Sequence, residues 1–216
     1  SKPAALSEFG KSLTNSEVKI IPNGFDYNRY RFSPAKRFEV RDILAIDKES
    51  IVFMHSGRFH HQKNHRFLLS VFQAIRKEIS NTYLLLLGDG NDRDAIMGFI
   101  EKQGLLNNVI MLGEKNNIQD YYSASDCLIF PSLYEGLPGV VIEAQINGLT
   151  SFVSNTITKE VKISDKITFL PIDKGEEIWI DEILNAVGKF RVGDSSISNR
   201  YMISRVVSEY MRIYNV

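Results

Sequence analysis

The sequence predicts an α/β protein in which helices cover both faces of an open, doubly wound parallel sheet. Three observations lead to this fold class. After about residue 50, short apolar runs alternate with longer amphipathic stretches, the runs are apolar on both faces, and Gly, Asp or Pro bounds them. Strands buried on both faces are typical of parallel sheets, and strict alternation of strand and helix implies right-handed βαβ units.

The individual elements follow from the same pattern, because short solid apolar runs indicate buried strands and longer periodic stretches indicate helices. Strands are expected at 51–55 ("IVFMH"), 82–87 ("TYLLLL"), 108–111, 127–130 ("CLIF"), 151–154 and 167–170. Helices are expected between them at 64–79, 91–103, 117–124 and 138–147, and then at 176–190.

The two ends of the chain depart from this alternation. A short helix is expected at 1–12, and a strand that runs into a Pro-Asn-Gly turn is expected at 17–26 ("EVKIIPNGFD"). A linker is expected at 32–36 ("FSPAK"). A last helix is expected over 196–216. The apolar stripe of this helix runs through Met202, Val206, Tyr210 and Ile213. Such a stripe is expected to pack against another surface.

The composition excludes several classes of protein. Of 216 residues, 44% are hydrophobic and 24% charged, which is the balance of a globular domain. Lys+Arg (26) equals Asp+Glu (26), so no bulk charge indicates nucleic-acid or anionic-membrane binding. The single cysteine, Cys127, cannot form an internal disulfide and is expected to be buried. The longest apolar runs are only about strand length, so we expect no membrane span and a cytoplasmic location.

Ligands of open parallel sheets bind outside the carboxyl ends of the strands. The first loop there is "SGRFHHQKN", in which Gly57 allows the backbone to approach a ligand. Arg58 and Lys63 precede a helix and could hold a diphosphate through their charges and the helix dipole. A solvated basic turn explains the same residues. The histidines at 60, 61 and 65 have no carboxylate or cysteine at ligand spacing, so no metal site is expected.

The next two loops carry weaker signals. "LLGDGNDRD" contains only half of a dinucleotide fingerprint, and a turn followed by a helix cap explains it adequately. The third loop begins at Gly113, where a flat ring could lie against the backbone beside Lys115. A plain loop is the alternative there.

The fourth loop, "PSLYEGLPGVVIE", is the most informative. Pro138 is expected at the first position of a helix, which places the free N–H groups next to Gly136 and Leu137 at the binding edge. Glu143 falls in the second turn among apolar neighbours, where a carboxylate suits a vicinal diol such as ribose better than solvent. Glu135 could bind a sugar ring in the same way, or could be an ordinary loop charge.

Taken together, these motifs resemble glycosyltransferase family 4, retaining enzymes of the GT-B fold. "IIPNGFDYNRY", "SGRFHHQKN", "LLGDGNDRD", "VIMLGEKNN" and "SASDCLIFPSLYEGLPGVVIEAQINGL" follow the order of that family, with its paired glutamates eight positions apart. The opening "SKPAALSEFGKS" and the later "VSNTITKEVKISDKITFLPI" look most similar to its capsular or exopolysaccharide branch.

The resemblance implies roles for these residues around a nucleotide-diphosphate sugar, linked to UDP or GDP. Arg58 and Lys63 would hold the diphosphate, Glu143 would bind the ribose, and the loop after residue 113 would hold the base. Glu135 would be the catalytic-site carboxylate and, with the amides of residues 136–138, would face the donor sugar. Neither a metal nor another cofactor is implied, because the cations and the helix dipole stabilise the departing nucleotide diphosphate.

The resemblance also implies a division of the chain. Residues 1–35 would end an N-terminal acceptor domain and form the interdomain linker. Residues 36–195 would be the Rossmann-like domain that binds the nucleotide sugar, and 196–216 a helix that crosses back to the N-terminal domain. The chain would then be the C-terminal half of a GT-B enzyme and, in isolation, would transfer little or no sugar.

The full-length enzyme would act on a saccharide or lipid-linked acceptor held by the missing domain, and not on nucleic acid. The resemblance allows that enzyme to associate peripherally with the inner face of the cell membrane. Two alternatives remain: a nucleotide-sugar 2-epimerase-like GT-B enzyme, and a non-catalytic α/β interaction module.

Overall fold

In the computed structural model, which describes residues 21–190 and 197–214, six parallel strands form one sheet in the order β3-β2-β1-β4-β5-β6. The predicted α/β parallel sheet is therefore confirmed. Its strands are β1 (Ile51–Ser56), β2 (Thr82–Leu87), β3 (Val109–Gly113), β4 (Cys127–Phe130), β5 (Thr150–Ser154) and β6 (Ile167–Leu170).

The strand order places a topological switch in the middle of the sheet. The chain begins at β1, moves outward through β2 and β3, and returns to β4 on the other side of β1. Phe53 of β1 lies opposite Cys127 of β4, and Met54 lies opposite Leu128. The helices that follow β1 and β4 pack on opposite faces of the sheet, and the crevice at such a switch is where ligands of open parallel sheets bind.

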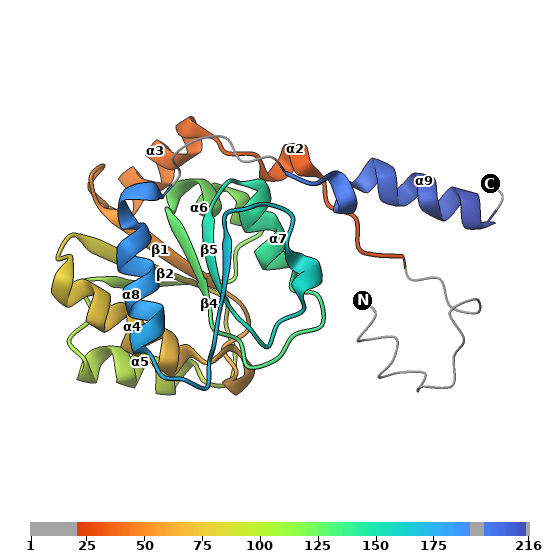
Figure 1. Ribbon diagram of the computed structural model, residues 1–216. Helices are drawn as coiled ribbons and strands as arrows, with labels where there is room; N and C mark the ends of the chain where they lie inside the picture. The colour runs from red at the N-terminus through yellow and green to blue at the C-terminus, as the bar shows by residue number, and fades with distance from the viewer. Residues whose placement is uncertain (1–20, 191–196, 215–216) are drawn as a thin grey trace.

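Helices cover both faces of the sheet, as Figure 1 shows. The helices predicted between residues 64 and 190 are all present, with ends that shift by at most four residues. They are α4 (His65–Glu78), α5 (Arg93–Lys102), α6 (Ile118–Ala124), α7 (Gly139–Ile146) and α8 (Glu177–Ala186), the last extended by a 3₁₀ turn, η3 (Val187–Lys189).

The sheet separates two apolar cores. Phe53 packs with Phe72 of α4 and Trp179 of α8 on one side. The next residue, Met54, belongs to the core formed with Tyr122 of α6 and α7 on the other side. Successive side chains of a strand point to opposite faces, so each buried strand supplies both cores at once.

The segment before the sheet differs from the prediction. Residues 32–36 were predicted as a linker, but a helix, α3 (Pro34–Ile43), begins inside them. The hydroxyl of Ser33 accepts a hydrogen bond from the Lys36 N–H, and Pro34 occupies the first helical position. One further turn, α2 (Tyr27–Tyr30), precedes α3 and is capped by the Asp26 carboxylate.

The expected strand at 17–26 is not present in its described part, residues 21–26. There Phe25 makes a single isolated bridge to Met202. Residues 17–20 and the helix expected at 1–12 lie outside the described residues.

The last helix, α9 (Ile203–Tyr214), begins later than the predicted residue 196 and follows a 3₁₀ turn, η4 (Asn199–Tyr201). Of its predicted apolar stripe, Val206 is buried whereas Tyr210 is 49% exposed. In Figure 1, α9 lies to one side of the sheet and helices. Within the described ranges, no helix combines the length and apolar character needed to cross a membrane. The proposed division at residues 35 and 195 stays a prediction.

Candidate functional site

Two predicted site residues meet at the topological switch. The Lys63 Nζ lies 2.5 Å from Glu135 Oε1, and their side chains are only 16% and 13% exposed. Lys63 comes from the loop after β1 and Glu135 from the loop after β4. The Lys63 ammonium also lies 4.8 Å from the centre of the Phe130 ring, at the end of β4. An ammonium has three donors, so this lysine retains bonding capacity beyond the glutamate.

Local structure explains how Lys63 reaches this place. It ends a 3₁₀ turn, η1 (His61–Lys63), and the next residue, Asn64, turns the chain into α4 with a left-handed backbone, φ 56°. A Cβ at position 57 would lie 2.8 Å from the Lys63 Cε. Gly57 therefore leaves room for the lysine stem to pass along the loop, a reason that the sequence pattern did not suggest.

The loops after β1 and β4 are also joined through backbone groups. Leu133 donates its N–H to the Gln62 carbonyl at 2.8 Å, and the Gln62 side-chain amide donates to the Tyr134 carbonyl at 2.7 Å. These bonds hold Lys63 and Glu135 on adjoining, mutually braced loops.

Arg58 is placed differently from Lys63. Its side chain is exposed, and a Cβ at Gly90 would lie 3.0 Å from its Cγ. A joint role of the two cations on a diphosphate therefore stays a prediction. Gly88 and Gly90 have φ values of 129° and 157°, and an added Cβ at either would collide with the loop after β1. The "GDG" segment is thus explained by close packing of two loops. Asp92 follows it as the N-cap of α5, but its side chain makes no capping hydrogen bond, so the predicted cap is confirmed in position only.

Two histidines lie beneath this region. His55 is fully buried, stacks on Phe130 with ring centres 5.4 Å apart, and places Nδ1 2.9 Å from the Ile129 carbonyl. The His65 ring lies edge-on to it at 5.0 Å. Burial lowers the pKa of His55 well below its usual value and, with a contribution from the Lys63 charge, lowers the pKa of His65 to about 4. Both are therefore neutral at pH 7.

The second glutamate lies on α7. Pro138 was predicted at the first helical position, but its ψ of 110° is extended, so it is the N-cap and the helix begins at Gly139. Glu143 remains in the second turn, as expected. The Tyr122 hydroxyl donates to Glu143 Oε2 at 2.8 Å. Burial, together with the negative charge of Glu143, raises the pKa of both Tyr30 and Tyr122.

Glu143 faces a cavity of about 540 Å³. One wall of this cavity comes from α7 and the other from the segment before the sheet, and the lining includes Phe25, Asp26, Arg29, Tyr30, Gly139 and Glu143. Sequence reasoning missed the contribution of this segment. Its "NGFD" turn predicted a strand end and supported the family resemblance, but it did not indicate a contribution to the site.

The remaining predicted residues surround these two groups. Gly113 ends β3 with φ 69°, and Lys115 is exposed in the loop that follows. Arg29 donates to the Asn116 carbonyl at 3.2 Å, which ties α2 to this loop. Ahead of α7, the short turn 136–137 leaves Gly136 exposed and Leu137 half-buried.

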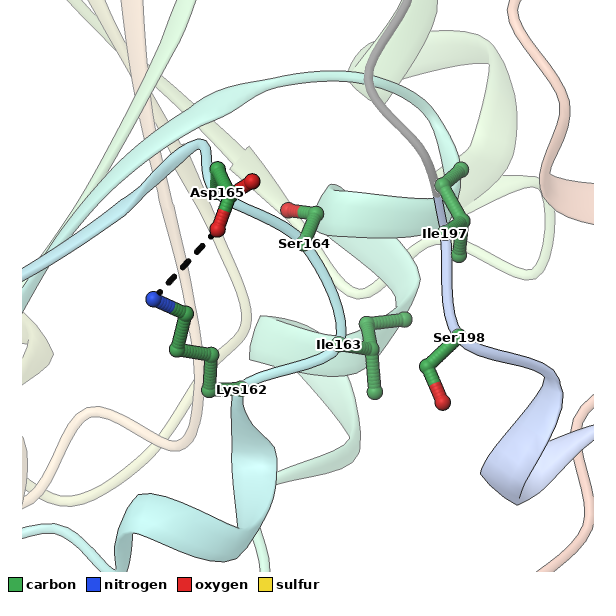
Figure 2. A pocket seen from close by; sticks show the side chains of 6 residues that line it. All are labelled: Lys162, Ile163, Ser164, Asp165, Ile197 and Ser198. Carbon is green, nitrogen blue, oxygen red and sulfur yellow. Dashed lines mark ion pairs between the residues drawn. The ribbon is translucent and has the colours of Figure 1, made fainter.

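Two further cavities are found in the described part of the chain. Figure 2 shows one of about 500 Å³, where Lys162 reaches toward Asp165 and Ile163 lies near Ile197. Its loop leads into the start of β6, so it belongs to the amino edge of the sheet, opposite the switch crevice. The other, of about 310 Å³, is lined by His60, His61, His65 and Asp92. Nowhere in residues 21–190 and 197–214 do three His, Cys, Asp or Glu side chains cluster so as to hold a metal.

Comparisons with known proteins show what this chain is similar to. Putative glycosyltransferase EpsF of Bacillus subtilis (strain 168) is 29% identical over 215 residues, which cover 96% of this chain and 56% of the relative. Capsular polysaccharide biosynthesis glycosyltransferase CapH of Staphylococcus aureus is 31% identical over 183 residues, covering 82% and 51%. The chain thus spans about half the length of the curated relatives that it matches.

The solved structures similar to this chain are GT-B glycosyltransferases, so its sheet has the Rossmann-like architecture of that fold. The structure of Anabaena Alr3699/HepE in complex with UDP-glucose superimposes with a TM-score of 0.83 at 19% identity, covering all of this chain and 62% of that one. The family profile described as Glycosyl transferases group 1 matches residues 36–176. With the profile covering more than half of its length, this chain belongs to the group 1 glycosyl transferases.

Proposed function

We propose that this chain is the donor-binding domain of a retaining glycosyltransferase of family 4, which transfers a hexose from a nucleotide diphosphate to a saccharide or lipid-linked acceptor. The setting would be capsular or exopolysaccharide biosynthesis, because relatives are named for capsule production. The acceptor site would lie in the part of the enzyme that this chain lacks. The isolated chain would bind donor weakly and transfer little sugar.

The observation that carries this proposal is the meeting of Lys63 and Glu135 at the switch point, with Glu135 on the loop that leads into α7. A cation and a helix N-terminus together suit a diphosphate. Glu143 faces the neighbouring cavity from the second turn of the same helix, where a ribose diol would fit its carboxylate.

The chemistry proposed for these groups is electrostatic. Bond cleavage leaves negative charge on the nucleotide diphosphate, and Lys63 with the α7 N–H groups would stabilise that charge without a metal ion. Glu135 would face the donor sugar, held in place by its bond to Lys63. Arg58 and the loop after Gly113 would contribute to the diphosphate and the base. UDP is the first nucleotide to test, since HepE was solved with UDP-glucose.

The test is a thermal-shift panel of UDP, GDP, ADP and their sugars. A ligand that binds only the folded state raises stability by RT ln(1 + [L]/Kd), so even millimolar affinity is visible at high concentration. Glu143→Ala should remove most of the shift while the unliganded Tm stays nearly constant, because the Tyr122 hydroxyl has the Val140 carbonyl as a second acceptor at 3.4 Å. No shift with any nucleotide, in protein shown to be folded, would contradict donor binding and favour the interaction module.

A second measurement distinguishes a glycosyltransferase from the 2-epimerase alternative. The full-length enzyme, supplied with nucleotide sugar, should transfer the sugar to an acceptor with its anomeric configuration retained. Release of epimerised free sugar would instead support the 2-epimerase alternative.

A further inference from the structure

The Glu143 carboxylate accepts a hydrogen bond from a fully buried tyrosine. Tyr122, on α6, has no exposed surface, and its hydroxyl donates to Glu143 Oε2 at 2.8 Å. This hydroxyl lies 21 residues before the glutamate in the chain, on a different helix. The contact therefore exists only because α6 and α7 pack on the same face of the sheet.

The ring of Tyr122 is itself fixed. It belongs to the core formed by β1, β4 and α7, and it meets the Tyr30 ring edge-on with centres 6.4 Å apart. The backbone that carries Tyr30 is tied to α7 as well, because the Asn147 side chain donates to the Tyr30 carbonyl at 2.9 Å. A hydroxyl on so rigid a support defines both the position and the rotation of the carboxylate.

A glutamate at a cavity wall would otherwise sample several rotamers. Fixing a long side chain costs about 1–2 kcal/mol, and a ligand must supply that free energy when the side chain is free before binding. Here one carboxylate oxygen is already engaged inside the protein. Glu143 also lines the cavity of about 540 Å³, so a diol bound there could donate to its carboxylate.

We infer that Tyr122 is a positioning residue that orients the Glu143 carboxylate toward the ribose diol of the nucleotide, and so makes the site selective for ribonucleotides. This inference rests on the proposed function, because it presumes that the cavity at Glu143 receives a nucleotide. Tyr122 itself does not touch the ligand.

The experiment compares nucleoside diphosphates with their 2′,3′-dideoxy analogues, which lack the diol. Calorimetric Kd values for UDP, GDP and ADP, each with its dideoxy partner, are measured on the wild-type chain, on Tyr122→Phe and Glu143→Gln, and on the variant that combines both substitutions. The matched control is Tyr121→Phe, which deletes a hydroxyl from the same helix at a position rotated by about 100°. Melting temperatures are recorded for every variant.

The wild-type chain should prefer the ribonucleotide, and Tyr122→Phe should weaken its binding about tenfold while dideoxy binding is unchanged. Tyr121→Phe should keep the wild-type preference, and Tyr122→Phe should add nothing in a Glu143→Gln background. An unchanged preference in Tyr122→Phe, or an equal loss for both nucleotides, would overturn the positioning role and leave donor binding intact. Failure of the wild-type chain to bind any nucleoside diphosphate would instead overturn the proposed function and this inference with it.

Discussion

The ion pair between Lys63 and Glu135 makes a prediction that links stability to binding. If the pair exists in the free protein, a diphosphate must share the Lys63 ammonium with a carboxylate of the same charge as itself. Neutralising the glutamate should therefore cost stability without costing affinity for a nucleoside diphosphate. Neutralising the lysine should cost both.

The structure sets the size of the stability effect. Exposed pairs contribute about 0–1 kcal/mol, whereas removing one partner of a buried pair costs about 3–5 kcal/mol. Side chains that are 16% and 13% exposed and 2.5 Å apart lie between these cases, so we expect a coupling free energy of about 2 kcal/mol. For a domain of this size, that corresponds to a difference in Tm of roughly 4–8 °C.

The assay is a double-mutant cycle with Lys63→Met, Glu135→Gln and the double variant. Urea unfolding gives the coupling free energy, and calorimetry gives Kd for the nucleoside diphosphate. Lys63→Met should weaken binding by more than tenfold. Glu135→Gln should leave the affinity equal to that of the wild-type chain or improve it by up to about tenfold.

Two results would refute this reasoning. A coupling free energy below about 0.5 kcal/mol would show that the pair stabilises the fold no more than an exposed ion pair does. A loss of affinity in Glu135→Gln equal to that in Lys63→Met would show that the carboxylate assists the phosphate contact and does not compete with it.

Three further predictions concern the surroundings of this pair. Gly57→Ala should displace the Lys63 stem, which an added Cβ would meet at 2.8 Å, and weaken nucleotide binding several-fold with a small change in Tm, measured by calorimetry and thermal melting. Asp126→Asn should cost about 3–5 kcal/mol in urea unfolding, because Arg41, 3% exposed, would lose a carboxylate at 2.7 Å. The pKa of His65, lowered to about 4, means that the unfolded chain binds a proton that the folded chain does not. Stability should therefore fall as the pH drops below 6.5, by about 2 kcal/mol between pH 7.5 and 5, and His65→Phe should reduce this slope.

The sheet could be predicted because its strands obey one simple rule. Phe53 and Met54 are both fully buried although they face opposite sides, so a solid apolar run marks a strand with a core on each face. Helices between such runs then follow from chain length and periodicity.

Helix α3 could not be found in this way because its buried face is partly charged. Arg41 is buried against the Asp126 carboxylate and four backbone carbonyls, while Phe38 and Ile43 are exposed. An amphipathic helix is expected to bury its apolar residues and expose its charged ones, and α3 does the opposite at these positions. The partner of Arg41 is more than eighty positions away, so no local signal reveals the compensation.

In the candidate site too, features that follow from a local sequence pattern could be predicted, and features that depend on contacts between distant segments could not. Lys63, Glu135 and Glu143 could be predicted because strand ends in a parallel sheet converge on one edge. Tyr122 and Tyr30 could not, because they act through contacts between helices. A tyrosine in an amphipathic stretch is equally typical of a core position, and only the packing of α6 on α7 turns its hydroxyl toward a carboxylate.

The two ends of the proposed donor site are held by different parts of the chain. The ribose end contacts the segment before α2, and the diphosphate end lies on the loops after β1 and β4. Phe25 lines the cavity at Glu143, and a Cβ at Gly139 would touch its ring at 3.4 Å. The Phe25 N–H donates to the carbonyl of Tyr201 in η4, and the Phe25 carbonyl accepts from the N–H of Ile203 at the start of α9. We therefore expect a displacement of α9 to move the wall of the proposed ribose pocket. The Lys63–Glu135 pair, braced by the loops after β1 and β4, has no such connection among these contacts, so the diphosphate end should keep its geometry while the ribose end responds.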